Sequence, residues 1–278
     1  MNNREIPMSK PTEYLMPLKL VALLEAANPS LHLLRLFHAC YAYVDRSKLL
    51  SVGVIAMPGR PGCKALCSDL SLITGSPSAK SNSWIGSAIE AGGWNTLFSQ
   101  LSIAEDAKVL AFKFSSKVSV SAMRNEKDKV FAMVDSDVLR TISSSKEALF
   151  YTRAAMVNKA DRPMFYLPGI CPETAPWTDN TKKSWLRIAA RVGERMDHHY
   201  VIMPERDPLT RDIARVKVKA VTPTSRWSPQ GLFLRPPCPP VSVVHDGKFR
   251  SLSRNELLAR HCWTRVIEPY DNGSPRNP

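Results

Sequence analysis

TDNTKKSWLRIAARVGERMDHHYVIMPERDPLTRDIARVKVKAV, residues 178–221, is the stretch of the chain that says most about its fold. It opens with polar residues of the kind that cap helices, and its apolar side chains then recur with the period of a helix. We therefore predict a helix that begins near Thr178 and ends near Met196. The expected apolar stripe consists of Trp185, Ile188, Ala189, Val192 and Met196.

The opposite side of this predicted helix is basic. Lys183, Arg187, Arg191 and Arg195 recur every four residues, and Lys182 adjoins the first of them. A row of cations on one helix is usually a solvated face. Here the residues that follow repeat the same sign, which favours contact with a polyanion.

Two strands are predicted after the helix. His199–Met203 is apolar, and residues 215–221 alternate valine with Arg215, Lys217 and Lys219. A cationic helix followed by a basic two-stranded ribbon is the outline of a winged helix-turn-helix, in which the helix enters the major groove and the ribbon follows phosphates. We expect the cations of helix and ribbon to share one outward surface.

The bulk composition agrees with a polyanionic partner. The chain has 278 residues, a formal net charge of +13 and 44% hydrophobic residues, enough for real cores. Residues 136–278 hold 23 Lys and Arg against 14 Asp and Glu, whereas residues 1–135 hold 15 against 11. The charge therefore points to a polyanionic partner, nucleic acid first and an anionic membrane second, with the stronger footprint in the second half.

Other classes of protein are disfavoured. A secretory signal and an apolar run of bilayer length are both lacking in this sequence, so we expect a cytoplasmic protein without membrane contact. The six cysteines are scattered, and only Cys63 and Cys67 are close in sequence. They form neither a disulfide framework nor zinc-finger spacing, so we expect buried thiols and no metal.

The first half of the chain repeats the helix-and-hairpin theme. We expect a helix over residues 18–27, a second one from Leu31 to about Val44 capped by Ser30, and a short helix from Lys64 to Thr74. The last of these should bury Leu66. A further helix begins at residue 79 or 81, and strands follow over residues 97–103 and 109–114.

This first helix-and-hairpin region also offers polar groups for nucleic acid. Lys80, Asn82 and Ser83 lie at a turn and a helix start, and Lys113 lies in the predicted hairpin. Such short donors can reach phosphates or base edges. An ordinary α+β segment, whose serines are caps and turn formers, is the alternative reading.

Residues 117–129 are polar and are expected to form a loop. Helices should follow from residue 135 or 136 and from the serines at 143–145, with a short strand at residues 164–167. After residue 221 the chain is rich in proline and contains a hairpin around Asp246-Gly247, and it could dock on protein partners. The expected divisions are 1–29 (arm and short helix), 30–120 and 130–221 (winged-helix-like domains), and 222–278 (proline-rich extension).

Two segments resemble plasmid replication initiator proteins built from two winged-helix domains in tandem. The first is SAKSNSWIGSAIEAGGW, residues 78–94, and the second runs from residue 136 to 151 and continues through FYLP at 165–168 into the basic helix. The resemblance is one of pattern and covers residues 30–221. It implies an α+β fold with two winged-helix-like domains in tandem, followed by the proline-rich extension, and a role in DNA binding.

No enzyme signature is recognisable in the sequence. Phosphate-cradling glycine loops, G-x-S-x-G and H-E-x-x-H are all lacking. The adjacent histidines His198 and His199 should point to opposite sides of a strand, which disfavours a shared site. Glu205, Asp207 and Asp212 are flanked by arginines and are expected to form surface ion pairs rather than a magnesium site. We expect no catalysis and no cofactor.

The sequence thus favours a protein that binds double-stranded DNA sequence-specifically, such as a replication initiator or a regulator of a mobile element. The alternative is a nucleic-acid-binding subunit of a multi-subunit ribonucleoprotein, such as an RNA-guided effector complex of the CRISPR type, in which basic surfaces hold RNA or DNA backbone.

Overall fold

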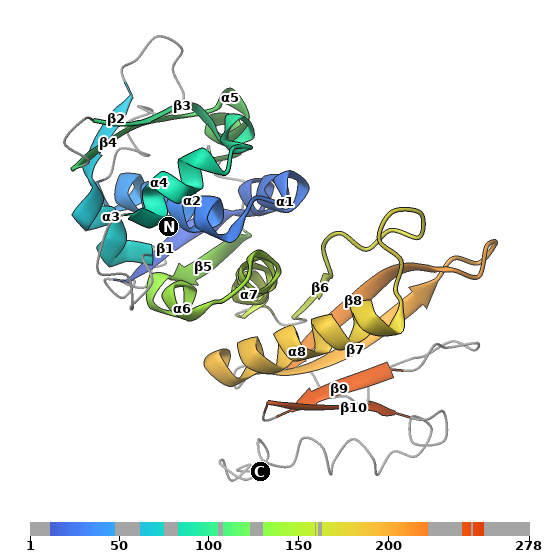
Figure 1. Cartoon of the computed structure of the whole chain (residues 1–278). Coiled ribbons are helices and arrows are strands. Elements are labelled where there is room, and N and C mark those ends of the chain that lie inside the picture. Colours follow the sequence, from blue (N-terminus) through green and yellow to red (C-terminus); the bar gives the residue numbers. More distant parts are fainter. Residues whose placement is uncertain are drawn as a thin grey trace, which may run out of the picture. The chain divides into compact units, whose positions relative to one another are not determined.

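The fold was analysed in a computed structural model, which describes residues 12–47, 62–74, 83–104, 108–122, 130–158, 160, 163–221, 241–245 and 247–252. Helices and strands are mixed, as expected for the α+β class. The chain divides into two compact units, Met1–Thr152 and Arg153–Pro278, and each is described by itself (Figure 1).

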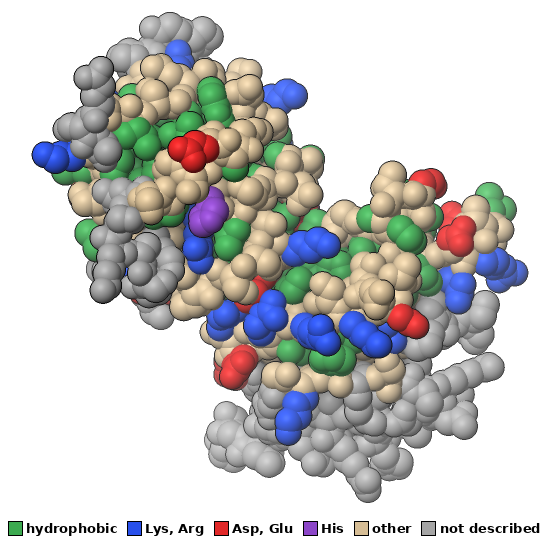
Figure 2. All heavy atoms as spheres, in the orientation of Figure 1, with side chains coloured by type: hydrophobic (Ala, Val, Ile, Leu, Met, Phe, Trp, Pro, Cys, Tyr) green, Lys and Arg blue, Asp and Glu red, His purple; other side chains and the backbone are tan. Residues whose placement is uncertain are grey.

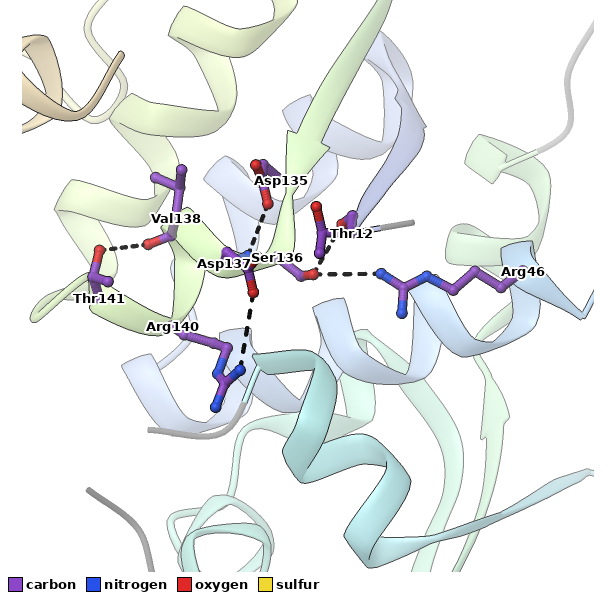
Figure 3. Close-up of polar contacts among 8 residues, drawn as sticks. All are labelled: Thr12, Arg46, Asp135, Ser136, Asp137, Val138, Arg140 and Thr141. Atoms are coloured by element: carbon purple, nitrogen blue, oxygen red, sulfur yellow. Dashed lines mark hydrogen bonds and ion pairs between the residues drawn. The ribbon is translucent and has the colours of Figure 1, made fainter. Parts of the chain in front are cut away.

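Unit 1 opens with a strand that the sequence did not lead us to expect. β1 (Glu13–Pro17) pairs antiparallel with β5 (Phe131–Asp135), although the first residues were predicted to be an arm. A polar cluster fastens the end of this ribbon (Figure 3). The Ser136 amide and hydroxyl both donate to the Thr12 carbonyl, at 3.1 and 2.8 Å, and Arg46 donates to the Ser136 hydroxyl at 3.4 Å.

The first two helices follow the predicted boundaries. α1 (Leu18–Ala27) ends at Asn28, whose backbone takes the left-handed conformation typical of a helix end. α2 (Leu31–Arg46) begins at Ser30, whose hydroxyl accepts a hydrogen bond from the Leu33 amide at 3.3 Å.

The three-stranded sheet of unit 1 has the order β2-β4-β3, with all neighbours antiparallel. The predicted helix over residues 64–74 is wrong at its start, because residues 63–66 form a strand that pairs with β4 and leaves Leu66 49% exposed. The loop predicted over residues 117–129 is wrong in its first part, since α5 forms there. The elements are β2 (Cys63–Leu66), α3 (Cys67–Thr74), α4 (Ser83–Glu90), η1 (Trp94–Thr96), β3 (Phe98–Ile103), β4 (Val109–Phe114) and α5 (Ser116–Ala122).

An aromatic cluster joins this sheet to α2. Phe37 of α2 lies edge-on to Phe98 and Phe114, with ring centroids 5.9 and 5.5 Å away, and Phe98 stacks on Phe114 at 5.4 Å. All three rings are buried. Aromatic pairs of this geometry add to the free energy gained by burying their area, so the cluster fixes one face of the sheet against α2.

Two capped helices end unit 1. α6 (Ser136–Thr141) begins at Asp135, whose carboxylate accepts from the Asp137 amide at 2.9 Å, as predicted. α7 (Ser145–Val157) begins with the Ser144 hydroxyl accepting from the Glu147 amide at 3.2 Å. The division between the two units falls inside α7.

Unit 2 is built on one five-stranded antiparallel sheet, of order β10-β9-β7-β8-β6, with α8 packed on it (Figure 1). The hairpin predicted around Asp246-Gly247 forms, but it joins the sheet of unit 2 rather than standing apart in an extension. The elements are β6 (Met164–Tyr166), α8 (Asp179–Met196), β7 (His199–Arg206), β8 (Ile213–Val221), β9 (Val241–His245) and β10 (Lys248–Leu252).

A tight loop stands before α8. Cys171 and Ala175 exchange two backbone hydrogen bonds, of 3.1 and 2.9 Å, between the end of β6 and the start of α8. The strand predicted at residues 49–57 and most of the proline-rich segment lie outside the described residues. None of the helices in the described ranges combines the length and apolar composition needed to cross a bilayer.

Candidate nucleic-acid interface

The candidate interface rests on α8, the longest helix in the described part of the chain. The Thr178 hydroxyl caps its first turn by accepting from the Thr181 amide at 3.2 Å. The helix ends at Met196, because Asp197 adopts a left-handed backbone with φ of 54°. These two ends match the boundaries predicted from the sequence.

One side of α8 is buried against the sheet. Trp185, Ile188, Ala189 and Val192 of the predicted stripe are all buried. Gly193 lies close to the sheet, since a Cβ added there would lie 3.3 Å from the Tyr200 ring. The helix is therefore held on the sheet face that carries Tyr200.

The outer side of α8 carries the cations, as predicted. We call Lys183, Arg187, Arg191 and Arg195 the α8 cationic strip. Lys183 and Arg187 are exposed, and Arg191 and Arg195 are partly exposed. Figure 2 shows Lys and Arg side chains following this helix. Each step of four residues advances about 6 Å along the axis, so the strip spans about 18 Å.

The members of the α8 cationic strip differ in their surroundings. Lys183 and Arg187 make no hydrogen bond or ion pair with another described residue, whereas Arg191 and Arg195 also interact within the protein. Glu194 is the exposed acidic side chain that lies among them. Lys182 is turned away from the α8 cationic strip, because its Nζ donates to the Ser251 hydroxyl of β10 at 2.8 Å.

The cations of β8 lie on the other face of the sheet, so the expectation of one shared surface is wrong. Tyr200 faces α8 and is paired with Ala220, so the even-numbered residues of β8 face the helix. Strand alternation then directs Arg215, Lys217 and Lys219 to the opposite face. The buried Val216, between two of these cations, confirms the alternation.

Two of the β8 cations are engaged by an acidic partner. Glu205 accepts a hydrogen bond from Arg215 Nε at 2.6 Å and also forms an ion pair with Lys217. Burial alone would raise the pKa of Glu205, but the hydrogen bonds from Lys217 and Arg215 outweigh it and lower that pKa. Both cations also approach the Tyr166 ring, at 4.7 Å for Arg215 and 5.7 Å for Lys217. The ion pairing predicted around Glu205 is therefore present.

The loop between β7 and β8 is a compact turn. One Asp207 carboxylate oxygen accepts from the Leu209 and Thr210 amides, at 2.7 and 3.0 Å. These bonds lower the pKa of Asp207. Leu209 is 90% exposed. Sequence reasoning missed this side chain, although a leucine between Asp-Pro and Thr-Arg in a predicted polar connection is an available signal.

The candidate residues of unit 1 are less informative. Lys113 lies on β4 between the buried Phe112 and Phe114, and therefore faces away from the aromatic cluster. Ser83 is exposed at the start of α4. Lys80 and Asn82 lie outside the described residues. The exposed side of α4 carries Ser83, Ser87 and Glu90, so it has no counterpart of the α8 cationic strip.

The adjacent histidines are both buried. His198 lies 3.0 Å from Asn158 Oδ1 and 3.3 Å from the Tyr200 hydroxyl, and burial lowers its pKa to about 4. His199 lies on the sheet face opposite Tyr200. Among the residues that the structure describes, no cluster of three His, Cys, Asp or Glu side chains could hold a metal ion.

No protein-family model matches the chain, and no curated protein matches its sequence.

Proposed function

We propose that the protein binds double-stranded DNA sequence-specifically, with α8 as the helix that enters the major groove. The observation that carries this proposal is the α8 cationic strip on the side of the helix opposite its packed stripe. A helix of about 10–12 Å diameter fits a major groove about 12 Å wide. The arginines of such a helix can reach guanine edges, and its lysine can reach a phosphate.

The order of elements supports a pair of winged-helix-like units. In unit 1 a long helix precedes β2, and α4 precedes the hairpin β3–β4. Farther along the chain, α7, which contains the division between the units, precedes β6, and α8 precedes the hairpin β7–β8. In both sheets the second strand of the hairpin lies between the first strand of the hairpin and the preceding strand, as in β2-β4-β3 and β6-β8-β7, although β9 and β10 extend the second sheet beyond β7. This strand order, with a helix before each hairpin, supports a tandem of winged helices, although α3 and α4 both lie between β2 and the first hairpin, whereas α8 alone lies between β6 and the second.

This reading suits a replication initiator or a regulator of a mobile element. Two units in one chain can read two segments of one site, and a strong positive charge speeds the approach to DNA. Unit 2 would supply the larger share of the electrostatic attraction to DNA, because the α8 cationic strip belongs to it.

The test begins with selection of bound duplexes from a random pool by the full chain. Binding of the selected duplex is then measured by fluorescence anisotropy as a function of salt. Lys183→Ala/Arg187→Ala should weaken binding by about 10- to 100-fold, from the loss of about 1–3 kcal/mol. It should also reduce the slope of log K against log salt by about 0.9, because the phosphate-neutralising charge of Lys183 is lost.

A charge-matched control is available in unit 1. Lys64→Ala/Lys117→Ala removes the same charge from two exposed side chains of β2 and α5. We expect a change of less than about threefold, since only the long-range field is altered. Equal weakening by both double variants, or none by the α8 variant, would remove α8 from the interface. Selection of RNA in preference to duplex DNA would replace the proposal by the ribonucleoprotein alternative.

A further inference from the structure

The tip of the β7–β8 hairpin presents an apolar side chain to water. Leu209 is 90% exposed, the highest value among the large hydrophobic residues of the described ranges, and its neighbours Pro208 and Thr210 are exposed as well. Burying a leucine stabilises a protein or a complex by about 1.5–3 kcal/mol. An exposed leucine at the end of a hairpin is therefore a candidate contact for a partner.

The loop that carries Leu209 is firmly braced. Besides the two hydrogen bonds that Asp207 Oδ1 accepts, the Asp207 amide donates to the Asp212 carbonyl at 2.8 Å, and the Arg211 amide donates to the Asp207 carbonyl at 3.1 Å. Arg206 Nη1 donates to the Arg211 carbonyl at 2.5 Å. These bonds stabilise the observed conformation of the loop, which reduces the conformational entropy that would be lost on binding.

The charge around the tip suits a polyanion. Of the carboxylates of Glu205, Asp207 and Asp212 near this tip, the first is paired with the β8 cations and the second accepts hydrogen bonds from backbone amides. The side chains of Arg206 and Arg211 are exposed on either side of the turn. A leucine between two exposed guanidinium groups matches the side chains that proteins insert into the minor groove.

The tip also lies at the correct end of α8. The chain turns tightly from α8 into β7, where the His198 amide donates to the Gly193 carbonyl at 2.9 Å. From there the 18 residues of α8 and the 8 residues of β7 extend about 27 and 26 Å. β7 therefore ends at about the level of the first turn of α8, and Figure 1 shows the hairpin tip beyond that turn, at the end of the helix that carries Lys183.

We propose that Leu209 is a wedge that enters the minor groove of the duplex held by α8, unstacks one base step and bends the DNA. This inference rests on the proposed function, and it assigns the hairpin a task that phosphate contacts alone do not perform. Apolar wedges of this kind bend duplexes by about 20–90°, and a bent duplex can wrap more protein surface.

The experiment uses the full chain and the duplex selected above. Bending is measured by energy transfer between dyes at the two ends of the duplex, and unstacking by the fluorescence of 2-aminopurine scanned through the site. The wild-type protein should bend the duplex and raise the signal at one step. Leu209→Ala should abolish that rise and most of the bend, whereas Leu209→Phe should keep both.

The matched control is Leu72→Ala, which truncates a leucine that is 71% exposed on α3 and should change neither signal. Leu209→Ala should also leave the salt slope unchanged, because no charge is lost, and Lys183→Ala/Arg187→Ala should reduce it. A duplex that stays straight with the wild-type protein overturns the wedge. The wedge is also overturned if Leu209→Ala leaves the bending intact. Weaker binding by that variant with intact bending would indicate that Leu209 makes another kind of contact. Failure of the proposed function would instead appear as an absence of duplex selection.

Discussion

At the residue scale, two helical glycines lie in opposite environments. A Cβ at Gly193 would lie 2.6 Å from the His198 carbonyl oxygen, whereas nothing lies within 4 Å of a Cβ at Gly86 in α4. Gly193→Ala should therefore lower the free energy of unfolding by about 1–3 kcal/mol, because the backbone must shift. Gly86→Ala should raise it by up to about 1 kcal/mol. Urea unfolding of both variants checks the prediction, and equal effects would contradict the close approach of α8 to the sheet.

Two buried histidines predict a loss of stability in acid. Burial lowers the pKa of His38 to about 3 and that of His198 to about 4. Both values lie below the ordinary 6.5, so the unfolded chain binds these protons first. Stability should be fully present above pH 6.5 and should fall as the pH drops towards 4, by roughly 2–3 kcal/mol for each histidine. Melting temperatures measured across this range should fall accordingly.

The matching variant for that measurement is His198→Gln, which keeps a polar group beside Asn158 but cannot take up a proton. It should flatten part of the decline between pH 6.5 and 4. An identical decline in the variant and the wild type would show that His198 is not responsible.

At the element scale, α8 combines an attractive strip with one opposing charge. Glu194 is exposed among its cations, and it would repel a phosphate. Glu194→Gln should therefore strengthen duplex binding about twofold to fivefold at low salt. The gain should disappear near 1 M salt, where charges are screened within about 3 Å. Anisotropy titrations test this: unchanged binding would place Glu194 outside the interface, and weaker binding would give it a structural role.

The helix and its ends could be predicted from the sequence because every cue is local. The capping Thr178, the apolar stripe and Asp197, which follows the last turn, all lie within the same twenty residues. The four members of the α8 cationic strip follow from the same periodicity. The sequence does not, however, predict which face of the sheet α8 covers. The alternation of residues in β8 defines two faces, but it does not indicate which of them packs against the helix. That missing information explains why Arg215, Lys217 and Lys219 were expected beside the helix.

Strands with distant partners were the other elements that sequence patterns missed. Residues 63–66 have spacing compatible with a helix, but they pair with β4, more than 40 positions later. β1 is likewise specified by β5 rather than by its own residues. Strand pairing overrides the local helix or loop propensity of a segment when the partner strand buries one side of it.

At the scale of the whole molecule, the two units share the order of three strands but not charge. Both have a helix before a hairpin whose second strand pairs with the preceding strand, yet only the α8 helix carries a cationic strip among the residues described. Under the proposed function, we expect the steep salt dependence of binding to arise mainly in unit 2. The net charge of +13 would add a weaker attraction that does not depend on sequence.

The pairing of β1 with β5 has a consequence during synthesis. The two strands lie between 114 (131 − 17) and 122 (135 − 13) positions apart. At about 5–20 residues per second, the ribosome needs roughly 6–25 seconds to deliver the second after the first. For that interval the N-terminal strand is an open edge on a nascent chain, where chaperones or neighbouring chains on a polysome compete for its backbone.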